Sequence, residues 1–88
     1  MKDKNENQKE FGTASFALAV FLYSKGEQVV GMSAIGGTEK KEFAFRDTPQ
    51  LQKLINTYKF GQKDDPEMII SVRDYEQARD KLLELLKG

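Results

Sequence analysis

The 88-residue chain contains no cysteine, no histidine and no tryptophan, and only two prolines. Without cysteine it can form no disulfide, thiolate nucleophile or iron–sulfur site. Without histidine it lacks the side chain that most often binds zinc or moves protons near neutral pH. Its 14 basic and 14 acidic residues give a formal net charge of zero, so it lacks the positive excess typical of dedicated duplex binders. The composition favours a binding scaffold, and we expect no catalytic residues, metal ion or cofactor.

The length allows one domain, because a chain of this size buries too little surface to form two cores. Residues 1–9 are expected to be a disordered polar tail, since five of them are charged and none after the first is apolar. Residues 10–88 then form the domain. The longest apolar run, residues 16–23, has eight residues, whereas a membrane-spanning helix needs about 20. With no secretory signal pattern either, we expect a cytoplasmic protein.

The first part of the domain is predicted to hold a short strand at residues 10–12 and a helix over residues 14–25. Thr13 would cap this helix, and Gly26 would follow it in the left-handed conformation. The helix is apolar on all sides, so it must be covered on more than one of them. A buried strand over the same run is the alternative, because the run is short and rich in valine and aromatic residues.

A hairpin is predicted next. Residues 28–35 and 40–46 have the composition of strands, and the glycine-rich residues 36–39 between them are typical of a turn. Because successive side chains of a strand point to opposite faces, Phe43 and Phe45 share one face of the second strand.

Two further helices carry capping signatures. The segment 47–50 offers capping side chains and a proline at the first helical position; apolar residues follow at helical spacing (Leu51, Leu54, Ile55 and Tyr58), and Gly61 ends that helix. Ser71 with Asp74 precedes a helix to about Lys87, whose expected inner face comprises Val72, Tyr75, Ala78, Leu82, Leu83 and Leu86.

Between those helices, residues 67–71 include Met68, Ile69 and Ile70 and predict a short strand. The complete order is then strand, helix, strand, strand, helix, strand, helix. This predicts an α+β fold, a small two-layer sandwich with the ferredoxin-like βαββαβ order and an added C-terminal helix.

Several residues combine into a pattern that resembles a family of short uncharacterised domains from bacterial and phage genomes. The features are a helix led by threonine and ending in Lys-Gly, a hairpin with Phe-x-Phe, and a helix rich in leucine and isoleucine. The residues are Thr13, Leu18, Ala19, Phe21, Leu22, Lys25, Gly26, Val30, Gly31, Phe43, Ala44, Phe45, Leu51, Leu54, Ile55 and Tyr58. The resemblance supports the fold and implies no activity.

The segment from Lys41 to Phe45 is also similar to the third strand of the RNA-recognition motif, with a basic residue followed by two aromatics. Glu42 stands where that motif has glycine. The resemblance implies single-stranded nucleic-acid binding through the hairpin face, where aromatic rings stack on bases and basic groups contact phosphates. The residues would be Lys40, Lys41, Phe43, Phe45 and Arg46. The alternative, which strand alternation favours, is that both rings pack in the core and the opposite face meets solvent.

The apolar helix is a second candidate surface. If the rest of the chain leaves part of it uncovered, Phe16, Val20, Phe21 and Tyr23 would form the contact of a homodimer, the commonest kind of oligomer. Residues 25–63 have a net charge of +3 and residues 64–88 a net charge of −3. Such a bipolar surface suits self-association or a charged protein partner. The leading hypothesis is a non-enzymatic, self-associating interaction module that also binds a protein partner, and a regulatory role is one option for it.

Overall fold

The computed structural model describes residues 9–34 and 41–87. Its elements are strand β1 (Glu10–Thr13), helix α1 (Phe16–Ser24), strands β2 (Val29–Ala34) and β3 (Lys41–Arg46), helix α2 (Pro49–Phe60), the 3₁₀ turn η2 (Pro66–Met68) and helix α3 (Val72–Lys87). The predicted α+β class is confirmed. The strand predicted at residues 10–12 is β1, and the two predicted hairpin strands are β2 and β3. The hairpin turn predicted at residues 36–39 lies outside the described residues.

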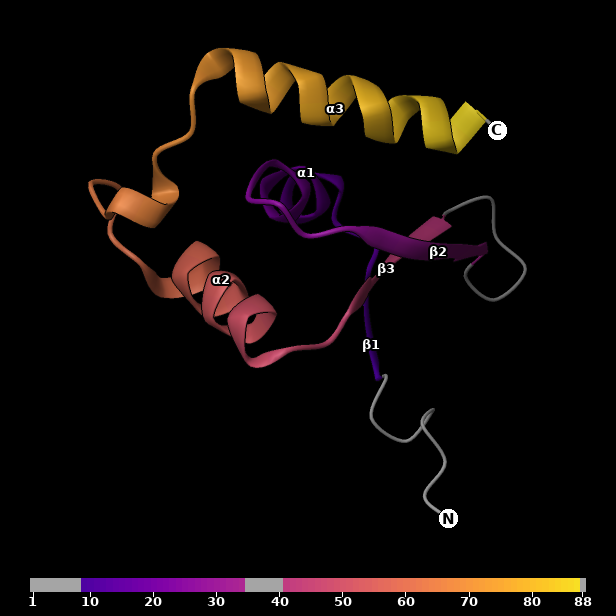
Figure 1. Cartoon of the computed structure of the whole chain (residues 1–88), viewed down its shortest axis with the longest axis horizontal. Helices are drawn as coiled ribbons and strands as arrows, with labels where there is room; N and C mark the ends of the chain where they lie inside the picture. The colour runs from indigo at the N-terminus through magenta and orange to yellow at the C-terminus, as the bar shows by residue number, and fades with distance from the viewer. Residues whose placement is uncertain (1–8, 35–40, 88) are drawn as a thin grey trace.

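The three strands form one antiparallel sheet in the order β1-β3-β2. On one face, the pairing sets Phe11 opposite Phe45 and Met32 opposite Phe43, and the rings of Phe43 and Phe45 are buried in the core. The other face carries Glu42, Ala44 and Arg46 from the central strand. None of the described helices covers that face, which we call the open face of the sheet (Figure 1).

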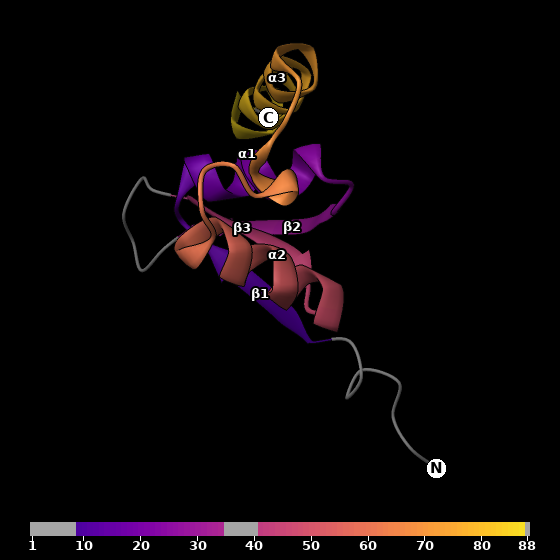
Figure 2. The same cartoon turned by 90° about the vertical axis from the view of Figure 1, so that its left-hand side faces the viewer.

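Helix α1 lies at the centre of the molecule. Residues Leu18 to Leu22 are all buried, and β1, α2 and α3 all contact this helix. Figures 1 and 2 both show α1 between the sheet and α3. The predicted need to cover this helix on several sides is therefore confirmed, and the alternative of a buried strand is wrong.

The predicted ferredoxin-like order is not confirmed, since the elements follow one another as β-α-β-β-α-α. Residues 67–71 form no strand. The Asp65 side chain accepts a hydrogen bond of 2.9 Å from the backbone N–H of Glu67, and Pro66 begins the turn η2. Met68 and Ile70 then pack against the core beside the helices. The alternating apolar pattern of this segment therefore buries its apolar side chains without pairing to the sheet. A two-layer description also falls short, because α3 lies outside α1 as a further layer (Figure 2).

The helix ends follow local hydrogen bonds. The predicted cap of α1 at Thr13 is wrong: Thr13 ends β1, and the Ser15 hydroxyl accepts from the backbone N–H of Leu18 at 3.2 Å. Gly26 has a φ of +100°, as predicted for the residue after this helix. The predicted cap of α3 is confirmed, because the Ser71 hydroxyl accepts from the backbone N–H of Asp74 at 3.0 Å. Within residues 9–34 and 41–87, no helix combines the length and apolar character needed to cross a membrane.

Thr48 caps α2 by accepting a hydrogen bond of 3.0 Å from the backbone N–H of Leu51. We expect Thr48→Ala to lower the free energy of unfolding by about 1 kcal/mol, because the N–H loses its partner. Thr48→Ser keeps the hydroxyl and should stay close to the wild type. Urea denaturation followed by circular dichroism measures both, and equal losses in the two variants would contradict the capping role.

Candidate functional site

The aromatic residues predicted for nucleic-acid binding lie inside the protein. Phe43 and Phe45 have exposed fractions of 2% and 0%, and the ring of Phe43 packs 6.2 Å from that of Phe16, measured between centroids. Lys41 and Arg46 are exposed at the two ends of β3, while Lys40 lies outside the described residues. The four described residues of this set therefore share no common surface. Neither Phe43 nor Phe45 exposes a ring on which a base could stack. Both rings pack in the core, as the alternative predicted.

The residues predicted for self-association are mostly covered by the chain itself. Val20 and Phe21 are buried, and the partly buried Phe16 and Tyr23 pack against the core. A dimer contact centred on these α1 side chains therefore stays a prediction, with Val20 and Phe21 offering little surface to a second copy. The physical reason is that α3 covers the side of α1 that faces away from the sheet. A surface with more exposed apolar side chains would suit self-association better.

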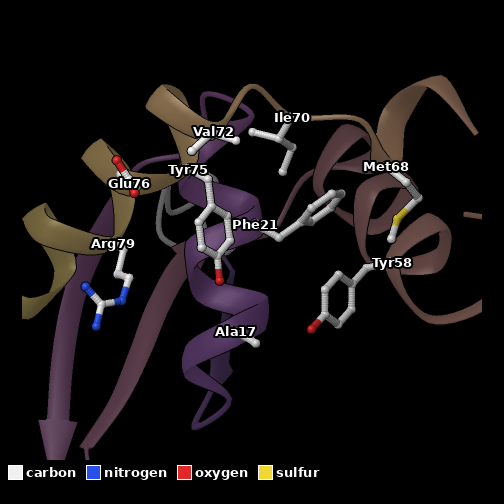
Figure 3. A pocket seen from close by; sticks show the side chains of 9 residues that line it. All are labelled: Ala17, Phe21, Tyr58, Met68, Ile70, Val72, Tyr75, Glu76 and Arg79. Atoms are coloured by element: carbon white, nitrogen blue, oxygen red, sulfur yellow. The ribbon is translucent and has the colours of Figure 1, made fainter.

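An apolar groove of about 540 Å³ lies between α1, α2, η2 and α3. Ala17 and Phe21 of α1 form its floor in Figure 3, with α2 and η2 on one side and α3 on the other. Its lining residues are Ala17, Phe21, Tyr58, Met68, Ile70, Val72, Tyr75, Glu76 and Arg79. Seven of these nine side chains are apolar or aromatic, so the groove can hold apolar groups from another molecule.

The polar groups that line the groove are two phenol hydroxyls, a carboxylate and a guanidinium. Figure 3 shows the hydroxyls of Tyr58 and Tyr75 pointing away from Met68 and Ile70, with the guanidinium of Arg79 on the same side as the Tyr75 hydroxyl. The ring of Tyr58 packs against that of Phe21, with 5.2 Å between centroids. Glu76 and Arg79 are the acidic and the basic residue of the lining. The groove thus offers an apolar floor and hydrogen-bonding groups at its edge.

Lys25 attaches the η2 segment to the end of α1. Its ammonium donates to the carbonyl oxygen of Ile69 at 3.4 Å and lies 3.6 Å from a carboxylate oxygen of Glu67. It also lies 5.9 Å from the centre of the Phe21 ring. The hydrogen bond joins residues 44 positions apart in the chain, and with the ion pair to Glu67 it connects α1 to the segment that carries Met68 and Ile70.

Residues 8–82 match the family described as "Domain of unknown function (DUF5659)". The chain belongs to this family. The predicted resemblance to a family of uncharacterised domains is confirmed, and the comparison found no RNA-recognition motif. No curated protein and no solved structure matched the chain. The matched span contains all nine lining residues of the groove, so the groove belongs to the DUF5659 domain itself.

The rim of the groove in this DUF5659 domain carries exposed apolar side chains. Val72 and Tyr75, which line the groove, are 73% and 38% exposed. Val72 and Tyr75 are predicted on the inner face of the last helix, and for these two residues the prediction is wrong. Of the predicted inner face, Ala78 and Leu82 are the residues that are buried. The sequence does contain a signal for these exposed residues. Residues 69–75 include more apolar residues than a single core-facing stripe of a helix requires.

Metal binding receives no support from the groove. Among residues 9–34 and 41–87, no group of three or more acidic side chains is placed to hold a metal ion.

Proposed function

We propose that this DUF5659 domain is a non-enzymatic interaction module that associates with a second copy of itself through the groove and its rim. The observation that carries the proposal is the exposure of Val72 and Tyr75 in the lining of an apolar groove. Adjacent exposed apolar side chains on a folded protein mark a surface that another molecule covers.

A protein segment suits this groove better than a small molecule. Small-molecule sites enclose most of the surface of their ligand, whereas this groove has an exposed apolar rim that a small ligand inside it would leave in water. A second copy brings the same apolar rim and buries both at once, as in an isologous dimer. We further propose that the dimer binds a protein partner, which is in keeping with the opposite net charges of residues 25–63 and 64–88.

Sedimentation equilibrium tests the self-association. We expect the average mass to rise from 10.0 kDa towards twice that value between low and high micromolar concentration. Val72→Lys should weaken the association about tenfold or more, because one apolar side chain is lost from the interface and a charge must be desolvated. Val30→Lys makes the same change at an exposed valine on strand β2 and should leave the association unchanged. A wild-type protein that stays monomeric at high micromolar concentration would contradict the proposal.

A further inference from the structure

Helix α3 presents two different flanks on either side of its buried residues. Val72, Glu76 and Arg79 line the groove, and their spacing of four and three residues places them in one row on the helix. Leu83, four residues beyond Arg79 and partly exposed, continues that row. The opposite flank is polar, with Asp74, Gln77 and Lys81 around a separate depression.

The row on the groove side has a symmetric pattern. It runs apolar, acidic, basic, apolar from Val72 through Glu76 and Arg79 to Leu83. When two such helices lie antiparallel about an axis halfway between Glu76 and Arg79, each Val72 meets the Leu83 of the other copy. Each Glu76 then meets the Arg79 of the other copy. The row is therefore complementary to itself, because apolar residues meet apolar residues and acidic residues meet basic ones. A two-fold contact requires this self-complementarity.

We infer that two copies of this chain pair antiparallel along this row of α3, with Glu76 of each copy beside Arg79 of the other. The inference rests on the proposed self-association and names its contact. The helix of the second copy then lies over the groove, because the row forms one wall of it. It covers the exposed apolar surface of Val72.

Charge selects the antiparallel arrangement. A parallel pair in register would set Glu76 against Glu76 and Arg79 against Arg79, and like charges across a contact disfavour that pairing. Within one copy, the guanidinium of Arg79 lies 3.7 Å from the carboxylate of Asp80, and both side chains are more than half exposed. Such an exposed ion pair between neighbours is weak, so Arg79 is free to meet a carboxylate of the second copy.

Charge reversal tests the register. In E76R the row has two basic residues, and in R79E it has two acidic ones, so each variant alone sets like charges against each other. We expect both single variants to associate about tenfold more weakly than the wild type, or weaker still. The double variant E76R/R79E restores opposite charges and should return to within about threefold of the wild-type dissociation constant. Lys81→Glu, on the opposite flank, is the matched control and should have no effect.

Mixing the two single variants is the decisive measurement. The basic copy and the acidic copy complement each other at both contacts, so fluorescence anisotropy of one labelled variant should rise on addition of the other, with an affinity at least equal to that of the wild type. Both substitutions are at exposed positions, and circular dichroism verifies that the variants are folded. If the wild type dimerises while both single variants do so equally well and the mixture gains nothing, the α3 pairing is overturned and the self-association stands. If the wild type is monomeric at high micromolar concentration, both are overturned.

Discussion

Phe45→Ala is expected to lower the free energy of unfolding by about 3 to 5 kcal/mol, as large-to-small changes of buried aromatics do. Phe45 is fully buried in the central strand β3, opposite Phe11 of β1 and Val29 of β2. Removing its ring leaves a cavity between the sheet and the helices that neighbouring side chains fill only in part. A domain of this size has a total stability of roughly 4 to 13 kcal/mol, so the variant should be largely unfolded at moderate urea concentrations.

The measurement is urea denaturation followed by circular dichroism. Phe60→Ala is the matched control, because Phe60 is exposed at the end of α2, and it should change the stability by less than about 0.5 kcal/mol. If Phe45→Ala cannot be purified folded, Phe45→Leu keeps most of the volume and should cost about 1 kcal/mol. Equal stability of Phe45→Ala and the wild type would contradict the core position, and would return the ring to the set of candidate surface residues.

Leu82→Ala is expected to release α3 from the rest of the domain. Leu82 and Ala78 are the buried residues of α3, and this helix packs mainly against α1. Loss of the leucine should cost about 2 to 5 kcal/mol. Because few other buried side chains hold the helix in place, much of that loss should appear as local opening of α3 before the sheet unfolds.

Hydrogen exchange followed by mass spectrometry distinguishes local from global loss. We expect peptides of α3 to exchange faster in Leu82→Ala, while peptides of β3 keep more of their protection. Leu85→Ala, three residues further along the helix at a position that is 37% exposed, is the matched control and should change little. Uniformly faster exchange in all elements would show that α3 unfolds only together with the sheet.

The sequence predicted those features that depend on residues close together in the chain. The start of α2 within the segment 47–50, where Thr48 forms the cap, and the cap of α3 at Ser71 each need a hydroxyl and a backbone N–H three residues apart. The inner face of α2 follows from helical spacing alone, and Leu51, Leu54 and Ile55 are buried as predicted. The pattern of α1 correctly required cover on several sides.

Features set by distant contacts were predicted poorly. Which elements cover Val20 and Phe21 depends on where α3 lies, more than 50 residues later in the chain, and no local pattern contains that information. For the same reason residues 67–71 were predicted to be a strand. Met68 and Ile70 do alternate with more exposed residues, but they pack against the core and line the groove, and the segment pairs with no strand of the sheet. The groove itself combines residues of four elements, and its exposed rim was mistaken for core because apolar residues serve interfaces as well as interiors.

The open face of the sheet has a consequence for how a dimer would bind. Helix α1 separates α3 from the sheet, so a contact along α3 leaves the faces bearing Glu42, Ala44 and Arg46 uncovered on both copies. If the proposed partner binds to this open face, the proposed dimer is bivalent. A partner with two matching sites, or two partners held together, would be bound with an avidity about a hundredfold or more above that of a single face, and dilution below the dimer dissociation constant would remove this gain at once.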